Sequence, residues 1–174
     1  MIIYTDGACK NNQNKSIRKA GCGVYFHNNS LNHSLNFNNI SIKLEGPKQT
    51  NQVAELTACI LGIEEVINKS NINNYNMQDI TIKTDSMYTI NCINTWFDGW
   101  KKKGWKKADS KPVDNLELIQ KLHYYVSTYN IKLIHVKAHK EEPSKDDPTY
   151  DDWYGNMMAD KLATLGAATN SYNN

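Results

Sequence analysis

Four acidic residues have the chemistry and the positions to form a metal site. Asp6 and Asp85 each end a predicted strand, and in open α/β sheets ligands gather outside the carboxyl ends of the strands. Glu55 and Asp160 lie close to the apolar sides of two predicted helices. Any one of them is better explained as a cap, a turn residue or part of a solvated helix face. Together, however, buried carboxylates repel one another unless cations compensate, and Mg²⁺ prefers oxygen ligands, so the set predicts a metal site if the fold brings the four residues together.

Hydrophobic periodicity predicts the elements that would position these residues. Alternating and β-branched patterns predict five strands, at residues 1–8, 20–27, 33–44, 79–85 and 131–136. Helical spacing predicts helices at 50–68, from 86, from 114 and at 156–165, with Thr50 or Asn51 capping the first and Asp114 the third. Short links favour an antiparallel arrangement of the first three strands. The order of elements predicts an α/β fold, a five-stranded mixed sheet with helices on both faces.

The composition is that of one globular domain. The chain has 174 residues, 40% hydrophobic and 22% charged, and no apolar run reaches the roughly 20 residues needed to cross a bilayer. A carboxylate at position 6 and the lack of a basic start argue against a signal peptide, so we expect a cytoplasmic protein. The sequence carries no signal for an oligomer, and a monomer is the default expectation. Four scattered cysteines are expected to be free thiols: Cys9, Cys22, Cys59 and Cys92. The net charge of +2 does not by itself indicate a polyanionic partner.

Four segments, in this order, resemble the signature segments of type 1 ribonuclease H: Tyr4–Ala8, Thr50–Leu56, Thr84–Tyr88 and Asn156–Ala163. The resemblance covers nearly the whole chain, with a catalytic domain at residues 1–168 and a short polar tail at 169–174. It implies a ribonuclease H-like fold and hydrolysis of the RNA strand of RNA–DNA hybrids. It also implies that Asp6, Glu55, Asp85 and Asp160 hold two Mg²⁺ (or Mn²⁺) ions. Two-metal hydrolysis would leave 5′-phosphate and 3′-hydroxyl ends.

A histidine follows the fifth predicted strand. His139 matches the histidine that this family places beside its metals, where it assists proton transfer or product release, and an ordinary imidazole pKa near 6.5 suits that role. His135 points elsewhere in the strand alternation and is interpreted as structural. Zinc binding by both histidines is not favoured, because residues four apart come together on a helix but not reliably on a strand. Residues 140–155 form a longer and more acidic connection than is usual in the family. A solvated insertion is favoured over a segment that attracts metal or repels nucleic acid.

The segment 96–112 combines lysines with tryptophans. Six lysines and two aspartates lie between Asp98 and Lys111, and lysines with flat aromatic rings are how many proteins hold a nucleic-acid strand. A solvated charged helix with its tryptophans facing the core would produce the same pattern. The segment resembles the basic protrusion with which cellular ribonucleases H hold the DNA strand.

The resemblance also implies contacts to the substrate. The DNA strand would lie against Tyr88, Trp96, Trp100, Lys101, Lys102 and Lys103. A DNA phosphate would be held by Lys48, Thr50 and Asn115. The minor groove and the RNA 2′-hydroxyl groups, which distinguish RNA from DNA, would be contacted by Cys9, Asn12, Asn51 and Gln52. Val53 stands where the family commonly has a basic residue, which removes one expected positive charge.

Three other functions are compatible with parts of the pattern. A DNA nuclease or junction resolvase of similar fold would share the acidic cluster, but the protrusion and the segment Thr50–Gln52 argue against it. A non-catalytic hybrid-binding module would not need all four acidic residues. A ribonuclease domain released from a reverse transcriptase is the third, and the sequence gives no sign of an upstream partner.

Overall fold

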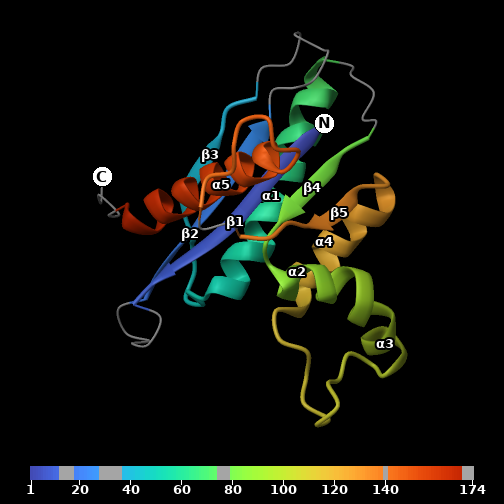
Figure 1. Ribbon diagram of the computed structural model, residues 1–174. Coiled ribbons are helices and arrows are strands. Elements are labelled where there is room, and N and C mark those ends of the chain that lie inside the picture. Colours follow the sequence, from blue (N-terminus) through green and yellow to red (C-terminus); the bar gives the residue numbers. More distant parts are fainter. Residues whose placement is uncertain (12–17, 28–36, 74–78, 139–140, 170–174) are drawn as a thin grey trace.

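The structure is a computed structural model that describes residues 1–11, 18–27, 37–73, 79–138 and 141–169 (Figure 1). Within these residues the sheet contains the following strands: β1 (Ile2–Lys10), β2 (Lys19–His27), β3 (Ile40–Lys43), β4 (Thr81–Thr84) and β5 (Lys132–His135). Their order in the sheet is β3-β2-β1-β4-β5. The first three strands are antiparallel, and β4 and β5 continue parallel to β1. The predicted mixed five-stranded sheet is confirmed.

The helices are α1 (Asn51–Asn73), α2 (Met87–Asn91), the π-helical turn η1 (Cys92–Trp96), α3 (Phe97–Lys102), α4 (Leu116–Thr128) and α5 (Tyr150–Ala168). The helix predicted from residue 86 therefore continues through η1 into α3 and takes in the start of the basic segment. Helix α1 extends five residues past its predicted end. None of the helices in the described part of the chain is long and apolar enough to cross a membrane.

Alternation along β2 places helices on both faces of the sheet, as predicted. Gly21 and Gly23 face α5, so closely that a Cβ on Gly23 would lie 2.1 Å from the carbonyl oxygen of Ala159. Cys22, between them, is buried against Ala54 on α1. Because neighbouring residues of a strand point to opposite faces, α1 and α5 lie on opposite sides of the sheet (Figure 1).

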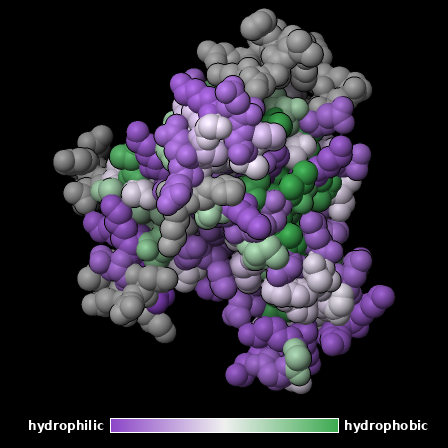
Figure 2. Space-filling view, in the orientation of Figure 1, coloured by the Kyte–Doolittle hydropathy of each residue, from purple (hydrophilic) through white to green (hydrophobic). Residues whose placement is uncertain are grey.

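The main hydrophobic core lies on the α1 side of the sheet. Ile63 of α1, Ile82 of β4 and Ile119 of α4 are fully buried there in one cluster. On the other side, α5 contacts β1, β2 and β3. Figure 2 shows hydrophobic side chains at the surface over β4 and β5, where α5 does not cover the sheet. Ile134 of β5 is 42% exposed.

Several predicted boundaries were wrong. Strand β1 continues to Lys10, so Asp6 lies inside the strand and does not end it as predicted. Strand β3 is four residues long, and residues 37–39 before it are not in the strand. Asp79 adopts a left-handed backbone, with φ at 56°, and therefore precedes β4 instead of starting it. Asp114 does not cap α4, because Asn115 occupies that position and Asp114 pairs with Lys107.

The last helix begins six residues earlier than predicted. Residues 150–155, expected to be loop, form the first turns of α5. Aromatic packing holds these turns in place, since the ring of Tyr154 lies 5.8 Å from that of Tyr25 and that of Tyr150 lies 5.6 Å from that of Trp153. Asp151 in the first turn also suits the positive end of the helix dipole.

Candidate active site

Three of the four acidic residues meet at one edge of the sheet. One carboxylate oxygen from each of Asp6, Glu55 and Asp85 lies within 4.8 Å of the other two. Asp6 belongs to β1 and Asp85 follows β4, which is the parallel neighbour of β1. Glu55 comes from the first turns of α1. Gly7 allows this approach, because a Cβ there would lie 2.3 Å from the backbone nitrogen of Glu55.

Asp160 adjoins this cluster from α5, which lies on the face of the sheet opposite to α1. It belongs to α5 and is exposed. Its carboxyl lies close enough to Asp6 to raise the pKa of that residue, by its charge and by a hydrogen bond. The structure therefore brings all four predicted residues to one site, three as a tight cluster and Asp160 at its edge.

Burial and mutual repulsion make the charged form of this cluster costly. Burial first, then the charges of Asp85 and Asp160, raise the pKa of Asp6 to about 8, although the Gly7 N–H donates a 2.8 Å hydrogen bond to its Oδ1. Burial, followed by Asp6 and Asp85, also raises the pKa of Glu55 well above its usual range. Among the described residues the buried Oε2 of Glu55 has no hydrogen-bond partner. Hard oxygen donors, one of them without a partner, fit a divalent cation such as Mg²⁺ or Mn²⁺.

Without divalent metal, Asp6→Asn is expected to stabilise the fold at neutral pH. The pKa of Asp6 is higher in the folded chain (about 8) than its ordinary 3.8, so folding takes up a proton and stability falls as pH rises through this window. Removing the charge should raise the free energy of unfolding by about 1–2 kcal/mol at pH 7.5, or Tm by about 2–8 °C. Thermal melts in EDTA at pH 5 and pH 7.5 measure this. Equal Tm values for the wild type and Asp6→Asn at both pH values would contradict this prediction. Asp146→Asn, at an exposed position, is the matched control.

Asn156 is a site residue that the sequence reasoning did not single out. Its Nδ2 donates a 3.0 Å hydrogen bond to Oδ2 of Asp85. The side chain is 6% exposed, and within the described part of the chain its Oδ1 has no partner. The available signal was its place at the head of the Asn156–Ala163 segment, one helical turn before Asp160 on the same face of α5.

The acidic connection is partly structural. Asp152 accepts a hydrogen bond from the Tyr4 hydroxyl (2.8 Å) and pairs with Lys83 of β4. These contacts fix the beginning of α5 to two central strands, so interpreting the whole insertion as solvated was wrong for Asp152. His139 and Asn12 lie outside the described residues.

The basic segment divides its aromatic residues between the core and the surface. Trp105 packs edge-on against the buried Phe97, whereas Trp96 is 38% exposed and lies 5.4 Å from the ring of Trp100. Both interpretations of the sequence pattern are therefore partly right. The next three lysines are exposed: Lys101, Lys102 and Lys103.

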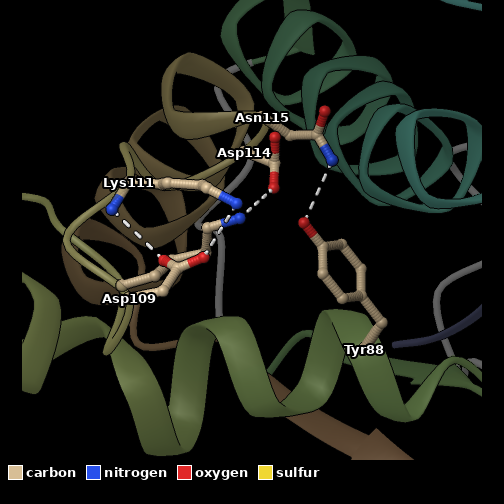
Figure 3. A network of polar contacts seen from close by, with 6 residues as sticks. Tyr88, Asp109, Lys111, Asp114 and Asn115 are labelled. Atoms are coloured by element: carbon tan, nitrogen blue, oxygen red, sulfur yellow. Dashed lines mark hydrogen bonds and ion pairs between the residues drawn. The ribbon is translucent and has the colours of Figure 1, made fainter.

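Ion pairs reduce the free charge of this segment. Lys107 pairs with Asp114 at 2.8 Å and Lys111 with Asp109 at 3.4 Å (Figure 3). Beside them, Asn115 has a left-handed backbone (φ 58°) and its Nδ2 donates a 3.0 Å hydrogen bond to the Tyr88 hydroxyl. This bond joins two predicted substrate residues that are 27 positions apart in the sequence.

The remaining predicted contact residues lie around the start of α1. Thr50 accepts a hydrogen bond from the Val53 N–H (3.3 Å), which confirms it as the helix cap. Lys48 lines a pocket of about 260 Å³ with Thr50, and a second pocket of about 830 Å³ with Asn115. Three residues complete the set. Asn51 donates to Oε1 of Glu55 (3.2 Å), the Cys9 thiol donates to the Gln49 carbonyl (3.5 Å), and Gln52 is exposed.

Fold and site together define an α/β domain with a cluster of carboxylates, suited to a hard cation, beside β1 and the carboxyl end of β4. The RNase H family model matches residues 1–168. "Ribonuclease H" of Ruthia magnifica is 36% identical over 169 residues, which are 95% of this chain and 93% of that protein. The chain belongs to the ribonuclease H family.

Other relatives are longer. "Ribonuclease H" of Schizosaccharomyces pombe is 38% identical, and the match covers 96% of this chain but 53% of that protein. The chain thus spans about half the length of this relative and of the human "Ribonuclease H1" (50%). The solution structure of the PFV RNase H domain superposes with a TM-score of 0.68 at 25% identity, covering 95% of this chain and 93% of that domain.

Proposed function

We propose that this chain is a metal-dependent endonuclease that hydrolyses the RNA strand of RNA–DNA hybrids. The observation that carries the proposal is the convergence of Asp6, Glu55 and Asp85 within 4.8 Å in a chain of the ribonuclease H family. We assign Asp160, which adjoins Asp6, to the same site. The four carboxylates would hold two Mg²⁺ ions, with Mn²⁺ as a substitute.

Each part of the site then has a defined task. When bound, two hard cations supply an activated water for in-line attack and stabilise the leaving 3′-oxygen, which gives 5′-phosphate and 3′-hydroxyl ends. Asn156 fixes the orientation of the Asp85 carboxylate, and Asn51 fixes that of Glu55. We assign His139 to proton transfer or product release near the scissile phosphate.

The substrate surface extends from the carboxylates to the protrusion. Trp96, Trp100 and Tyr88 offer apolar rings to the DNA strand, and exposed lysines beside them neutralise its phosphates. We assign Lys48, Thr50 and Asn115 to one DNA phosphate. The minor groove and 2′-hydroxyl groups are assigned to Cys9, Asn12, Asn51 and Gln52.

A panel of three labelled duplexes tests the proposal. The purified chain is incubated with Mg²⁺ and an RNA–DNA hybrid, a double-stranded RNA or a double-stranded DNA of the same sequence. We expect cutting of the RNA strand of the hybrid alone, with 5′-phosphate products. Equal cutting of all three duplexes would identify a nuclease of other specificity, and binding of the hybrid without cutting would identify a binding module.

A further inference from the structure

A second basic region lies in the first three strands. Residues 7–44 contain five basic residues and no acidic one, although the whole chain has a net charge of only +2. The basic residues of this stretch are Lys10, Lys15, Arg18, Lys19 and Lys43. Lys15 lies outside the described residues. This concentration of charge is separate in sequence from the protrusion at 96–112.

The strand register places three of these lysines near one another on one face of the sheet. Lys10 of β1 lies directly opposite Lys19 of β2. In the neighbouring pair, Gly21 of β2 lies opposite Lys43 of β3. Residues directly opposite in an antiparallel pair share a face, and so do residues two apart along a strand. Lys10, Lys19 and Lys43 therefore share a face, and we call them the lysine row.

The lysine row lies on the same face of the sheet as Asp6. Asp6 and Lys10 are four residues apart on β1, whose pairing with β2 runs without interruption, so the two side chains point the same way. The distance along the strand is about 13 Å. Asp6 belongs to the carboxylate cluster, where the scissile phosphate would be held. The lysine row therefore lies farther along β1, beyond this cluster.

Acidic residues are few in the sequence around the lysine row. Helix α5 covers this face as far as Gly21, but the sequence has no acidic side chain after Asp160. Glu45 lines a pocket of about 380 Å³ together with Arg18, Lys19 and Lys43. Like charges directly opposite on paired strands, as at Lys10 and Lys19, are destabilising. A polyanion lying across the pair would remove this cost.

The lysine row and the protrusion lie on different sides of the carboxylate cluster. In Figure 1 the joined ends of β1 and β2 and helix α3 project at opposite sides of the molecule, with the carboxyl end of β4, which Asp85 follows, between them. A duplex that reaches from α3 across the cluster would continue over the lysine row.

We propose that the lysine row binds backbone phosphates of the RNA strand, beyond the scissile phosphate and away from the protrusion. This inference rests on the proposed function, which places the RNA strand at the carboxylates and the DNA strand at the protrusion. The lysine row follows Asp6 along β1, and it is therefore assigned to the RNA strand. The hybrid is then held on both sides of the cluster, with one strand neutralised on each side.

The test compares two double variants of the full chain. Lys10→Gln with Lys19→Gln removes two charges from the lysine row. Lys69→Gln with Lys132→Gln removes the same charge from the far half of α1 and the far end of β5. The first variant is expected to raise the KM for hybrid about tenfold at about 0.1 M salt, and to lower the slope of log affinity against log salt by about 2, with kcat unchanged. Its Tm should stay equal or rise, because a like-charged pair is removed.

Neutral methylphosphonate linkages identify the strand. Placed in the RNA strand outside the cutting site, they should weaken binding to the wild type and leave binding to the Lys10/Lys19 variant unchanged. The same pattern with linkages in the DNA strand instead would overturn the strand assignment. If the wild type cuts hybrid and the Lys10/Lys19 variant keeps the same KM and salt slope, the role of the lysine row is overturned and the proposed function stands. A wild type that cuts no hybrid would overturn the proposed function, and the lysine row is then judged by equilibrium binding of the hybrid.

Discussion

Asp85→Asn is expected to reduce cutting of an RNA–DNA hybrid by about a thousandfold or more, which corresponds to about 4 kcal/mol of lost transition-state stabilisation. Asp85 shares the 4.8 Å cluster with Asp6 and Glu55, and the substitution removes a negative charge that a divalent cation would require there. An asparagine keeps an oxygen that can accept the 3.0 Å hydrogen bond from Asn156, so the fold should persist. Single-turnover cutting with saturating Mg²⁺ measures the effect.

The same strand provides the control for this variant. Asp79→Asn makes an identical chemical change at the other end of β4, away from the cluster. Its backbone is left-handed (φ 56°), a conformation that asparagine tolerates as well as aspartate. We expect full activity from Asp79→Asn, and unchanged binding of hybrid by Asp85→Asn. Full activity of Asp85→Asn would exclude the proposed metal site.

Replacing Lys101, Lys102 and Lys103 with alanine is expected to raise the KM for hybrid about tenfold or more, with a smaller effect on kcat. All three side chains are exposed at the end of α3 and its C-cap, beside the exposed ring of Trp96. Each phosphate contact contributes about 0.9 to the salt slope on a duplex, so the slope should fall by about 2–3. Alanine is a good helix former, and α3 should therefore keep its structure.

A second triple variant controls for the loss of net charge. Lys69, Lys121 and Lys132 lie on α1, α4 and β5, and their replacement by alanine also removes three charges. Lys69 and Lys121 pair with partly exposed glutamates, and such pairs contribute about 1 kcal/mol each or less. Binding titrations from about 50 to 200 mM salt should show a reduced slope in the protrusion variant alone. Equal slopes in the two triple variants would mean that the protrusion makes no specific contact.

Much of the site follows from local sequence. Alternation reveals the strand that contains Asp6 and the strand that Asp85 follows, and a 3.6-residue period reveals the helix that carries Glu55. These patterns are local, because a strand or a helix repeats its buried side every two or about four residues. Asp160 was likewise indicated by its place on a predicted helix, and the order of the four family segments supported it. The sequence by itself therefore predicted which acidic residues gather, and the comparisons confirmed the family.

Tertiary structure decided the features that depend on contacts distant in sequence. Helix α5 begins at Tyr150 because Asp152 binds Lys83 and Tyr4, which are 69 and 148 residues away, and no local period encodes such pairings. The two tryptophans differ for the same reason. Trp105 faces inward because it packs against Phe97 in the core, whereas Trp96 stays 38% exposed.

The charges show the same division. Composition identified the lysines of the protrusion, but ion pairs with Asp109 and Asp114 leave two of them partly neutralised. Only the register of β1 with β2 aligns Lys10 with Lys19, since a shift of one residue would send one side chain to the other face. Sequence thus determined the kinds of residue and their local order, whereas the long-range pairing of strands and helices decided which charges lie together, because electrostatic energy depends on distance in space.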